Sequence, residues 1–291
     1  MSSHRGTIFV DDEARILEHT AFEAGQYILR VQAPKCAAAA TAGSFAHVTC
    51  DPSLPMRRPL SIMRADPKQG WIDILYKVHG AGLKLLSQRK AGDTLSILGP
   101  IGVGFRPRPE RHRAVLIGGG VGIPPMVFLA ESMSATTAPP IAFFGSEIPF
   151  PFRVRPSTML VPGMPDGVIA CMPLLDGWGV PSRLASFAQY PGCFEGYVTD
   201  LAAHYLQGLD PATLAETEIF ACGPTVMLKA VARLAARFAL PAQVSLEEFM
   251  ACAVGGCAGC AVAVQTADGT AMKRVCVDGP VFEASAVFPQ A

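Results

Sequence analysis

Short apolar runs, broken by polar and turn-forming residues, fill the first hundred positions of the chain. Each run is rich in β-branched and apolar residues, and Pro, Gly and Asp separate one run from the next. This pattern is typical of β-strands, and several strands in one block predict an antiparallel barrel. The expected strands are 27–32, 45–49, 60–63, 71–78 and 94–98, with one short helix at 83–88.

The pattern changes after a basic, proline-containing segment at 106–113, which predicts a domain boundary. An apolar strand at 114–117 runs into the glycine-rich turn 118–122, and a helical pattern then continues through Glu131. Another apolar strand follows at 141–144. Strand, turn, helix and strand form a βαβ unit, which predicts a parallel, Rossmann-like sheet with right-handed crossovers.

Further segments fit the same sheet. We expect strands at 168–170 and 218–221 and a helix over 225–239, whose apolar and basic residues fall on different faces. The stretch 146–166 is proline-rich and has little periodicity, which indicates an irregular excursion.

The last fifty residues have a third character. Gly and Cys dominate 252–260, and two apolar runs then flank an Asp268-Gly269 turn, which predicts a hairpin. The fold class is therefore α/β plus β, with a barrel, a parallel-sheet domain and a small cysteine-rich segment. The predicted boundaries are 1–108, 109–245 and 246–291.

Composition narrows the range of functions. Of the 291 residues, 50% are apolar and 16% are charged, which allows a sizeable core and disfavours disorder. The 24 basic and 24 acidic residues balance, whereas nucleic acid or anionic lipid would call for a basic excess. Membrane-spanning runs and a signal-peptide pattern are not expected, so the prediction is a cytoplasmic protein.

Four of the nine cysteines cluster near the C-terminus. Cys252, Cys257, Cys260 and Cys276 have the spacing C-x4-C-x2-C-x15-C, and its first three members match plant-type [2Fe–2S] ferredoxins. Glycines between them allow a tight loop to turn its thiolates toward a cluster. A structural zinc site is the main alternative, although zinc sites usually use paired C-x2-C knuckles. A second alternative is that these cysteines are buried and inert and that their spacing arose by chance.

The glycine turn after the strand at 114–117 opens a helix, where backbone N–H groups suit a pyrophosphate. It lacks the third glycine of G-x-G-x-x-G, so a tight turn without a ligand is the alternative. A Cys-Gly-Pro triplet follows a second strand and should lie at the same carboxyl edge, where open α/β sheets bind ligands. The candidate residues are Gly118, Gly119, Gly120, Gly122, Cys222, Gly223 and Pro224.

Glu147 follows the strand at 141–144. A carboxylate there can accept hydrogen bonds from ribose hydroxyls and would repel a 2′-phosphate, which favours NAD over NADP. Arg153 and Arg155 lie close in sequence and could reverse that preference.

Two barrel segments supply candidate flavin contacts. Arg58 can pair with a phosphate, Ser61 can hydrogen-bond a ring edge, and Tyr76 can stack or donate its hydroxyl. The alternative places Arg58 on the surface and Tyr76 in the barrel core. The candidates are Arg58, Pro59, Leu60, Ser61, Tyr76, Lys77, Val78, Gly80, Gly82 and Leu83.

These motifs together resemble the ferredoxin–NADP reductase superfamily. Within it, the chain is most similar to the electron-transfer subunits of two-component, NAD-linked dihydroorotate dehydrogenases. The similarity rests on 58–62, 99–105, 118–122, 222–224 and 275–282, in the order flavin barrel, dinucleotide domain and [2Fe–2S] segment. Leu83 stands where the family usually has Thr, and Ala253 replaces a common glycine.

The resemblance implies FAD, NAD and a [2Fe–2S] cluster as cofactors, with Cys222 beside the reacting carbon of the nicotinamide. It also implies that electrons from dihydroorotate, oxidised in pyrimidine biosynthesis by an FMN-containing catalytic subunit, pass through the cluster to FAD and then to NAD. The implied assembly is a heterotetramer. Two alternatives stay open: a reductase for a hydrogenase, ferredoxin or oxygenase, and a non-catalytic iron–sulfur redox sensor.

Overall fold

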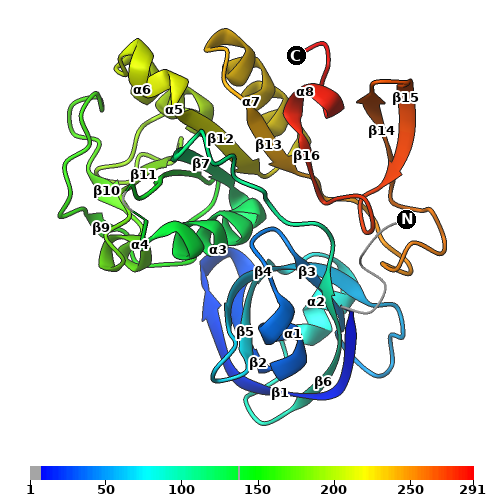
Figure 1. The fold of residues 1–291 in the computed structure, drawn as a ribbon. Coiled ribbons are helices and arrows are strands. Elements are labelled where there is room, and N and C mark those ends of the chain that lie inside the picture. Colours follow the sequence, from blue (N-terminus) through cyan, green and yellow to red (C-terminus); the bar gives the residue numbers. More distant parts are fainter. Residues whose placement is uncertain (1–7, 137) are drawn as a thin grey trace. The chain divides into compact units, whose positions relative to one another are not determined.

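The computed structural model describes residues 8–136 and 138–291 (Figure 1). The chain divides into two compact units, one formed by Met1–Gly104 with Leu246–Val281 and the other by Phe105–Ser245 with Phe282–Ala291. The cysteine-rich segment thus groups with the N-terminal strands. The finer division at 108 and 245 into three domains stays a prediction.

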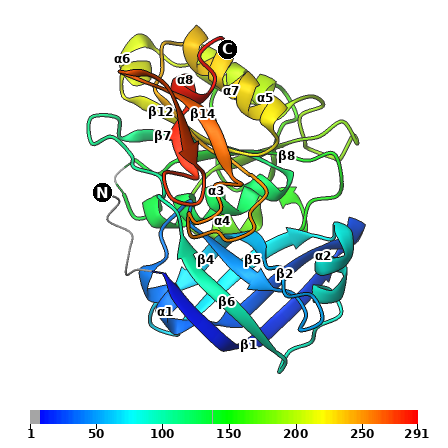
Figure 2. The same cartoon turned by 90° about the vertical axis from the view of Figure 1, so that its right-hand side faces the viewer.

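Six antiparallel strands close the barrel of the first unit, in the order β1-β2-β5-β4-β3-β6. Figure 2 shows this barrel, with β1, β2, β4, β5 and β6 labelled. The five strands predicted here are confirmed, and helix α2 (Gly80–Leu86) begins three residues before its predicted start. The strands are β1 (Phe9–Phe22), β2 (Gln26–Gln32), β3 (Phe45–Thr49), β4 (Arg58–Asp66), β5 (Trp71–Lys77) and β6 (Thr94–Ile101).

The longest barrel strand, β1, was not expected from the sequence. Acidic and basic residues interrupt its apolar positions, and only Ala14 and Ile16 are buried along it. Strand β1 forms because it pairs with β2 and β6 on its two sides, although its own residue pattern does not predict a strand. The turn η1 (Glu23–Gly25) and the short helix α1 (Pro34–Ala39) complete this part of the chain.

The second unit is built on a sheet in the order β11-β8-β7-β12-β13-β16, whose first five strands are parallel. Helices α5 (Val198–Gln207) and α7 (Thr225–Arg237) pack together against it, while α3 (Ile123–Met133) packs with α4 (Pro173–Gly177) (Figure 1). The predicted α/β architecture is confirmed. The strands are β7 (Arg113–Gly119), β8 (Ile141–Gly145), β11 (Ser182–Ala185), β12 (Thr217–Cys222), β13 (Ala242–Ser245) and β16 (Val281–Glu283).

The run at 168–170 was placed in the wrong sheet. Strand β10 (Ala170–Cys171) pairs antiparallel with β9 (Arg155–Pro156) in a separate two-stranded sheet. Ile169 is 49% exposed, so this short apolar run is not a buried central strand. In the parallel sheet, the strand that pairs with β8 on this side is β11 instead.

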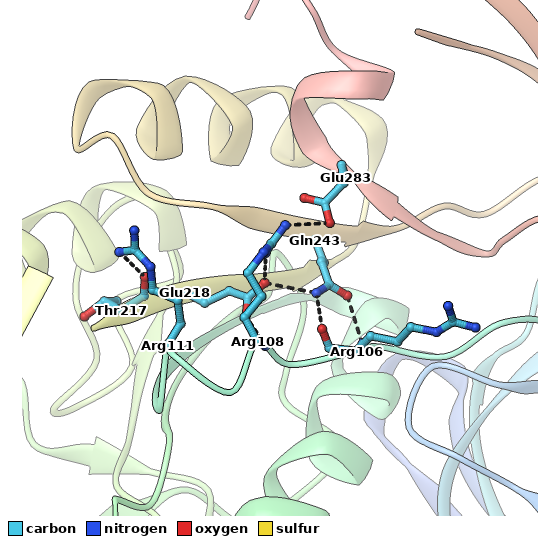
Figure 3. Close-up of polar contacts among 7 residues, drawn as sticks. All are labelled: Arg106, Arg108, Arg111, Thr217, Glu218, Gln243 and Glu283. Carbon is cyan, nitrogen blue, oxygen red and sulfur yellow. Dashed lines mark hydrogen bonds and ion pairs between the residues drawn. The ribbon is translucent and has the colours of Figure 1, made fainter. Parts of the chain in front are cut away.

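A buried ionic network braces the sheet of the second unit (Figure 3). The side chain of Glu218, on β12, has no solvent exposure, pairs with the guanidinium of Arg108 and accepts a 2.9 Å hydrogen bond from the Arg108 backbone. Gln243 on β13 donates to the same carboxylate at 3.0 Å, and Arg108 also pairs with Glu283 at 2.8 Å. The linker before β7 and the C-terminal strand β16 are therefore both fastened to the central strands.

The predicted C-terminal hairpin is confirmed as β14 (Ala261–Thr266) and β15 (Gly269–Arg274). Gly269 has φ +106°, which the tight turn requires and most other residues would resist. The remaining helices are α6 (Pro211–Ala215) and α8 (Ala284–Val287). In the described part of the chain, every helix is too short or too polar to cross a lipid bilayer.

Candidate functional site

The four predicted cluster ligands approach one another in two pairs. The Sγ atoms of Cys260 and Cys276 are 3.3 Å apart, although 15 residues separate them in the sequence. The Sγ of Cys252 accepts a hydrogen bond from the backbone N–H of Cys257 at 3.4 Å. Cys252 also acts electrostatically on Cys276, which links the two pairs. The fold therefore brings all four cysteines together.

The two pairs differ in their surroundings. Burial, the largest cause, raises the pKa of the Cys276 thiol to about 12, with the adjacent Cys260 acting in the same direction. Burial would also raise the pKa of Cys252, but backbone N–H groups of Val254, Cys257 and Gly256 lower it to about 7. The Cys276 thiol, which resists ionisation, needs a cation beside it before it can act as a thiolate ligand.

The loop leaves room beside the sulfurs. A Cβ atom added at Gly256 would lie 4.0 Å from the Cys252 sulfur, and one added at Gly259 would lie 3.5 Å from the Cys257 sulfur. Within the described residues, no three side chains of His, Cys, Asp or Glu gather as ligands of a single metal ion. Two sulfur pairs instead match a centre with two irons and two thiolates on each, so the donor set fits a [2Fe–2S] cluster.

A brace on the cluster loop escaped the sequence analysis. Arg274 donates from Nη1 to the carbonyl of Gly255 at 2.7 Å, and its backbone N–H donates to the Asp278 carboxylate at 2.8 Å. The N–H of Val275 donates to the carbonyl of Cys260 at 3.0 Å. These bonds hold the loop against the segment that carries Cys276. The sequence offered one signal for these bonds, which is the position of Asp278 two residues after Cys276.

The predicted flavin strand and glycine turn come together in the first unit. A Cβ atom added at Gly82 would lie 3.1–3.2 Å from guanidinium atoms of Arg58, so a side chain there would crowd this guanidinium at the start of α2. Gly80 has φ +70° and open space beside it. Arg58 also donates to the Met56 carbonyl at 2.8 Å. A guanidinium beside a helix start is a suitable place for a phosphate.

Other flavin candidates lie along β4 and β5. Pro59 and Ser61 are half-buried, Leu60 points into the barrel, and Lys77 is exposed, with half-buried Val78 and Leu83 beyond it. Tyr76 is 1% exposed, stacks on Tyr27 and lies 2.8 Å from His19 through its hydroxyl. Burial raises the pKa of Tyr76. The side chain of Tyr76 therefore lies in the barrel core, as the alternative has it, and a flavin contact at this residue stays a prediction.

The glycine turn and the Cys-Gly-Pro triplet meet at one edge of the sheet, as predicted. Strands β7 and β12 are parallel neighbours, and Cys222 is in register with Gly118 at their carboxyl ends. The turn η2 (Gly120–Gly122) lies against this triplet, because a Cβ atom on Gly122 would lie 2.3 Å from the Cys222 carbonyl oxygen. Gly119 is similarly close to Met227, and Gly120 has φ +55°.

Glu147 lies just beyond β8, the other neighbour of β7, where Gly145 is in register with Gly119. Its side chain is exposed at the same carboxyl edge as the glycine turn. Pro224 is also exposed there, whereas Cys222 is 1% exposed and Gly223 is buried. The edge therefore combines backbone N–H groups, a thiol and a carboxylate.

Comparisons with known proteins show which family the chain belongs to. Residues 247–288 match the iron–sulfur cluster binding domain of dihydroorotate dehydrogenase B. The electron-transfer subunit of dihydroorotate dehydrogenase B (NAD(+)) from Bacillus caldolyticus is 34% identical over 252 residues, covering 84% of this chain and 86% of the relative. The subunit from Desulforamulus reducens is 30% identical over 277 residues, covering 93% and 95%. The chain belongs to the family of dihydroorotate dehydrogenase B electron-transfer subunits.

Solved structures agree with this family's architecture at the level of fold. An NADH-dependent reduced ferredoxin–NADP oxidoreductase superposes with a TM-score of 0.75 at 24% identity, covering 95% of this chain and 90% of that one. The ferredoxin reductase of carbazole 1,9a-dioxygenase superposes with a TM-score of 0.59 at 21% identity, covering 80% and 67%. The fold expected from the resemblance to ferredoxin–NADP reductases is confirmed.

Proposed function

We propose that this chain passes electrons from a dihydroorotate-oxidising flavoprotein, through a [2Fe–2S] cluster and FAD, to NAD. The observation that carries the proposal is the meeting of Cys252, Cys257, Cys260 and Cys276 in two sulfur pairs, within a segment that matches the family's cluster domain. The resemblance implies that this electron transfer serves pyrimidine biosynthesis. We place the protein in the cytoplasm, where thiols stay reduced.

A chain of this kind needs three cofactors because their electron counts differ. When bound, NAD exchanges a hydride, the cluster carries one electron at a time, and the flavin converts between the two. The protein supplies position and electrostatics. The order of the three binding segments along the chain supports this division of labour.

We assign the flavin to the first unit. The Arg58 guanidinium, which lies against Gly82, would pair with a flavin phosphate, and the start of α2 would offer backbone N–H groups to it. Leu83 has no hydroxyl to add a hydrogen bond there, so these backbone donors carry more of the binding. The half-buried Ser61 would hydrogen-bond the edge of the ring system.

We assign NAD to the carboxyl edge of the second unit. The turn at Gly118–Gly122 would hold the pyrophosphate through backbone N–H groups, and Glu147 would accept hydrogen bonds from a ribose. The register of Cys222 with Gly118 supports a thiol beside the nicotinamide. The exposed carboxylate of Glu147 favours NAD over NADP.

The proposed partner is an FMN-containing catalytic subunit, in a heterotetramer. Cys257 is exposed, which leaves one side of the cluster site open. Phe249 is 94% exposed and Val254 is 51% exposed in the same loop region. Apolar side chains around an open redox site suit a docking protein. The formal net charge of +0 gives no attraction for nucleic acid.

The full chain tests this proposal directly. A purified sample should absorb as a flavin and as an oxidised [2Fe–2S] centre, and NADH should reduce a dye through the flavin. Cys257→Ser should abolish electron transfer between the chain and its FMN partner while NADH-dependent dye reduction continues. Cys193→Ser, a half-exposed cysteine in the other unit, is the matched control and should change neither reaction.

Two results would overturn the proposal. One is a purified, folded chain without cluster absorbance after anaerobic preparation. The other is unchanged electron transfer to the partner in Cys257→Ser. Co-purification with a hydrogenase or an oxygenase component instead of an FMN subunit would favour a reductase for another partner, and the absence of any NADH-dependent dye reduction would favour a redox sensor.

A further inference from the structure

His47 is an outward-facing barrel residue that is nevertheless buried. On β3, Val48 is in register with Ile97 of β6, and both are buried in the barrel core. His47 alternates with Val48 and is in register with Pro59 of β4, so it lies on the outer face of the barrel. Its exposure is only 1%.

The cluster segment covers this outer face. The N–H of Val103 donates to the carbonyl of Gly279 at 2.5 Å, and a Cβ atom on Gly102 would collide with Pro280 and approach Phe45. The backbone of Met250, two residues before the first cluster cysteine, acts on the His47 imidazole. All of these residues belong to the first unit.

The imidazole has unmet hydrogen-bonding capacity. Neither Nδ1 nor Nε2 of His47 makes a hydrogen bond to any residue that the structure describes. Leaving a buried donor or acceptor without a partner is energetically costly, and native proteins rarely tolerate it. An apolar residue at this position would avoid that cost. The presence of a histidine therefore indicates a specific role for its ring nitrogens.

The backbone groups around the ring identify that role. Burial, followed by the charge of Arg57, lowers the pKa of His47 to about 4, so the ring is neutral at pH 7. The backbone carbonyl groups of Arg57 and Met250 act in the opposite direction, so both lie beside the ring as potential acceptors, although neither completes a hydrogen bond to it. Arg57 directly precedes the flavin strand β4, and Met250 belongs to the cluster loop.

A neutral imidazole carries one N–H, and two carbonyl groups compete for it. The choice of nitrogen that holds the hydrogen decides whether His47 is tied to the flavin strand or to the cluster loop. We propose that His47 is a positioning residue that links the flavin-binding strand to the cluster loop. Through this link it helps to hold the cluster in place. The inference rests on the proposed function, since it assumes a flavin and a cluster on either side.

Substitutions of His47 in the full, cofactor-loaded chain test this role. His47→Leu removes both ring nitrogens, whereas His47→Gln keeps a donor and an acceptor. Thr49→Val, two residues along the same outer face, is the matched control. The readouts are flavin content, the rate of cluster loss to a chelator, the EPR spectrum of the reduced cluster, and thermal unfolding.

We expect His47→Leu to keep its flavin and its NADH-dependent dye reduction within about twofold of the parent. Cluster loss should be about 10–100 times faster, which is the usual range for removing a group that supports metal ligands, and the EPR spectrum should shift. His47→Gln should recover most of the parent's cluster retention. Thr49→Val should match the parent throughout.

Parent-like cluster loss and an unchanged EPR spectrum in His47→Leu would overturn the proposal, as would a parallel loss of flavin and cluster with a lowered unfolding temperature. Should His47→Leu fail to fold, a folded His47→Gln that loses its cluster more than about tenfold faster than the parent would also overturn the proposal. A parent chain without any cluster would instead sink the proposed function, so the two failures are distinguishable.

Discussion

The cluster loop and the dinucleotide sheet obtain their order in opposite ways. Strands β8 and β12 are almost fully buried, and the sheet satisfies even a buried carboxylate, Glu218, from within the chain. Between Cys252 and Cys260, by contrast, most positions are exposed, and Ala253 and Ala258 adopt φ near +55°. The sheet depends on burial and paired charges, whereas the loop would depend on the cluster that we propose for its three cysteines and Cys276.

The largest effect is expected when the buried carboxylate of Glu218 loses its cationic partner. Arg108→Ala should lower the free energy of unfolding by about 3–5 kcal/mol, because it leaves the charge of Glu218 buried without its cation. Urea denaturation of the second unit would measure this. Arg111→Ala is the control shown beside it (Figure 3) and should cost less than about 1 kcal/mol, because its two hydrogen bonds are long, at 3.3 and 3.5 Å.

A double variant sharpens that result. Arg108→Ala with Glu218→Gln should recover a large part of the loss, because the second change removes the stranded charge. If the double variant were no more stable than Arg108→Ala alone, packing rather than charge would explain the effect, and the contrast with the loop would weaken.

Removing iron should separate the two regions. After chelation, amide hydrogens in 252–260 should exchange about 100 times faster, whereas those of β7 and β12 should change less than about twofold, because local opening energies differ between regions of one protein. Mass spectrometry of peptides from both regions would measure the exchange. Equal acceleration in the sheet would show that the cluster stabilises the whole chain and not only its own loop.

Cys222 tests the chemical use of the sheet edge. Cys222→Ala should slow flavin reduction by NADH about tenfold, equivalent to about 1.4 kcal/mol in the barrier, because the thiol would no longer position the nicotinamide. Rapid-mixing absorbance of the flavin would follow the rate. Cys171→Ala, another fully buried cysteine, is the control, and an equal effect of both changes would contradict a role specific to Cys222.

The smallest expected effect concerns backbone strain in the loop. Ala253→Gly should stabilise the folded loop by about 1 kcal/mol, because a left-handed conformation costs an L-residue about 1–2 kcal/mol that glycine does not incur. The rate of cluster loss to a chelator should fall accordingly. Ala251→Gly is the nearby control without such strain and should leave that rate unchanged or raise it.

Local patterns in the sequence predicted much of this protein. The five predicted barrel strands, the turn at Gly118–Gly122, the helix after Cys222 and the hairpin at Gly269 all follow from nearby residues and are confirmed. The spacing of the four cysteines predicted a cluster site because metal chemistry constrains ligand type and separation. These features are set by chemistry within a few residues.

Only the tertiary structure decided the rest. The charged strand β1, the small sheet of β9 and β10, and the edge strand β11 depend on pairing partners that are distant in sequence. The burial of Glu218 and His47 likewise depends on the tertiary structure, since a glutamate or a histidine in the sequence does not show whether its side chain will be buried. Hydrogen-bond partners and burial depend on residues that are distant in sequence and meet only in the folded protein. Turn geometry and ligand spacing depend on short stretches of the chain.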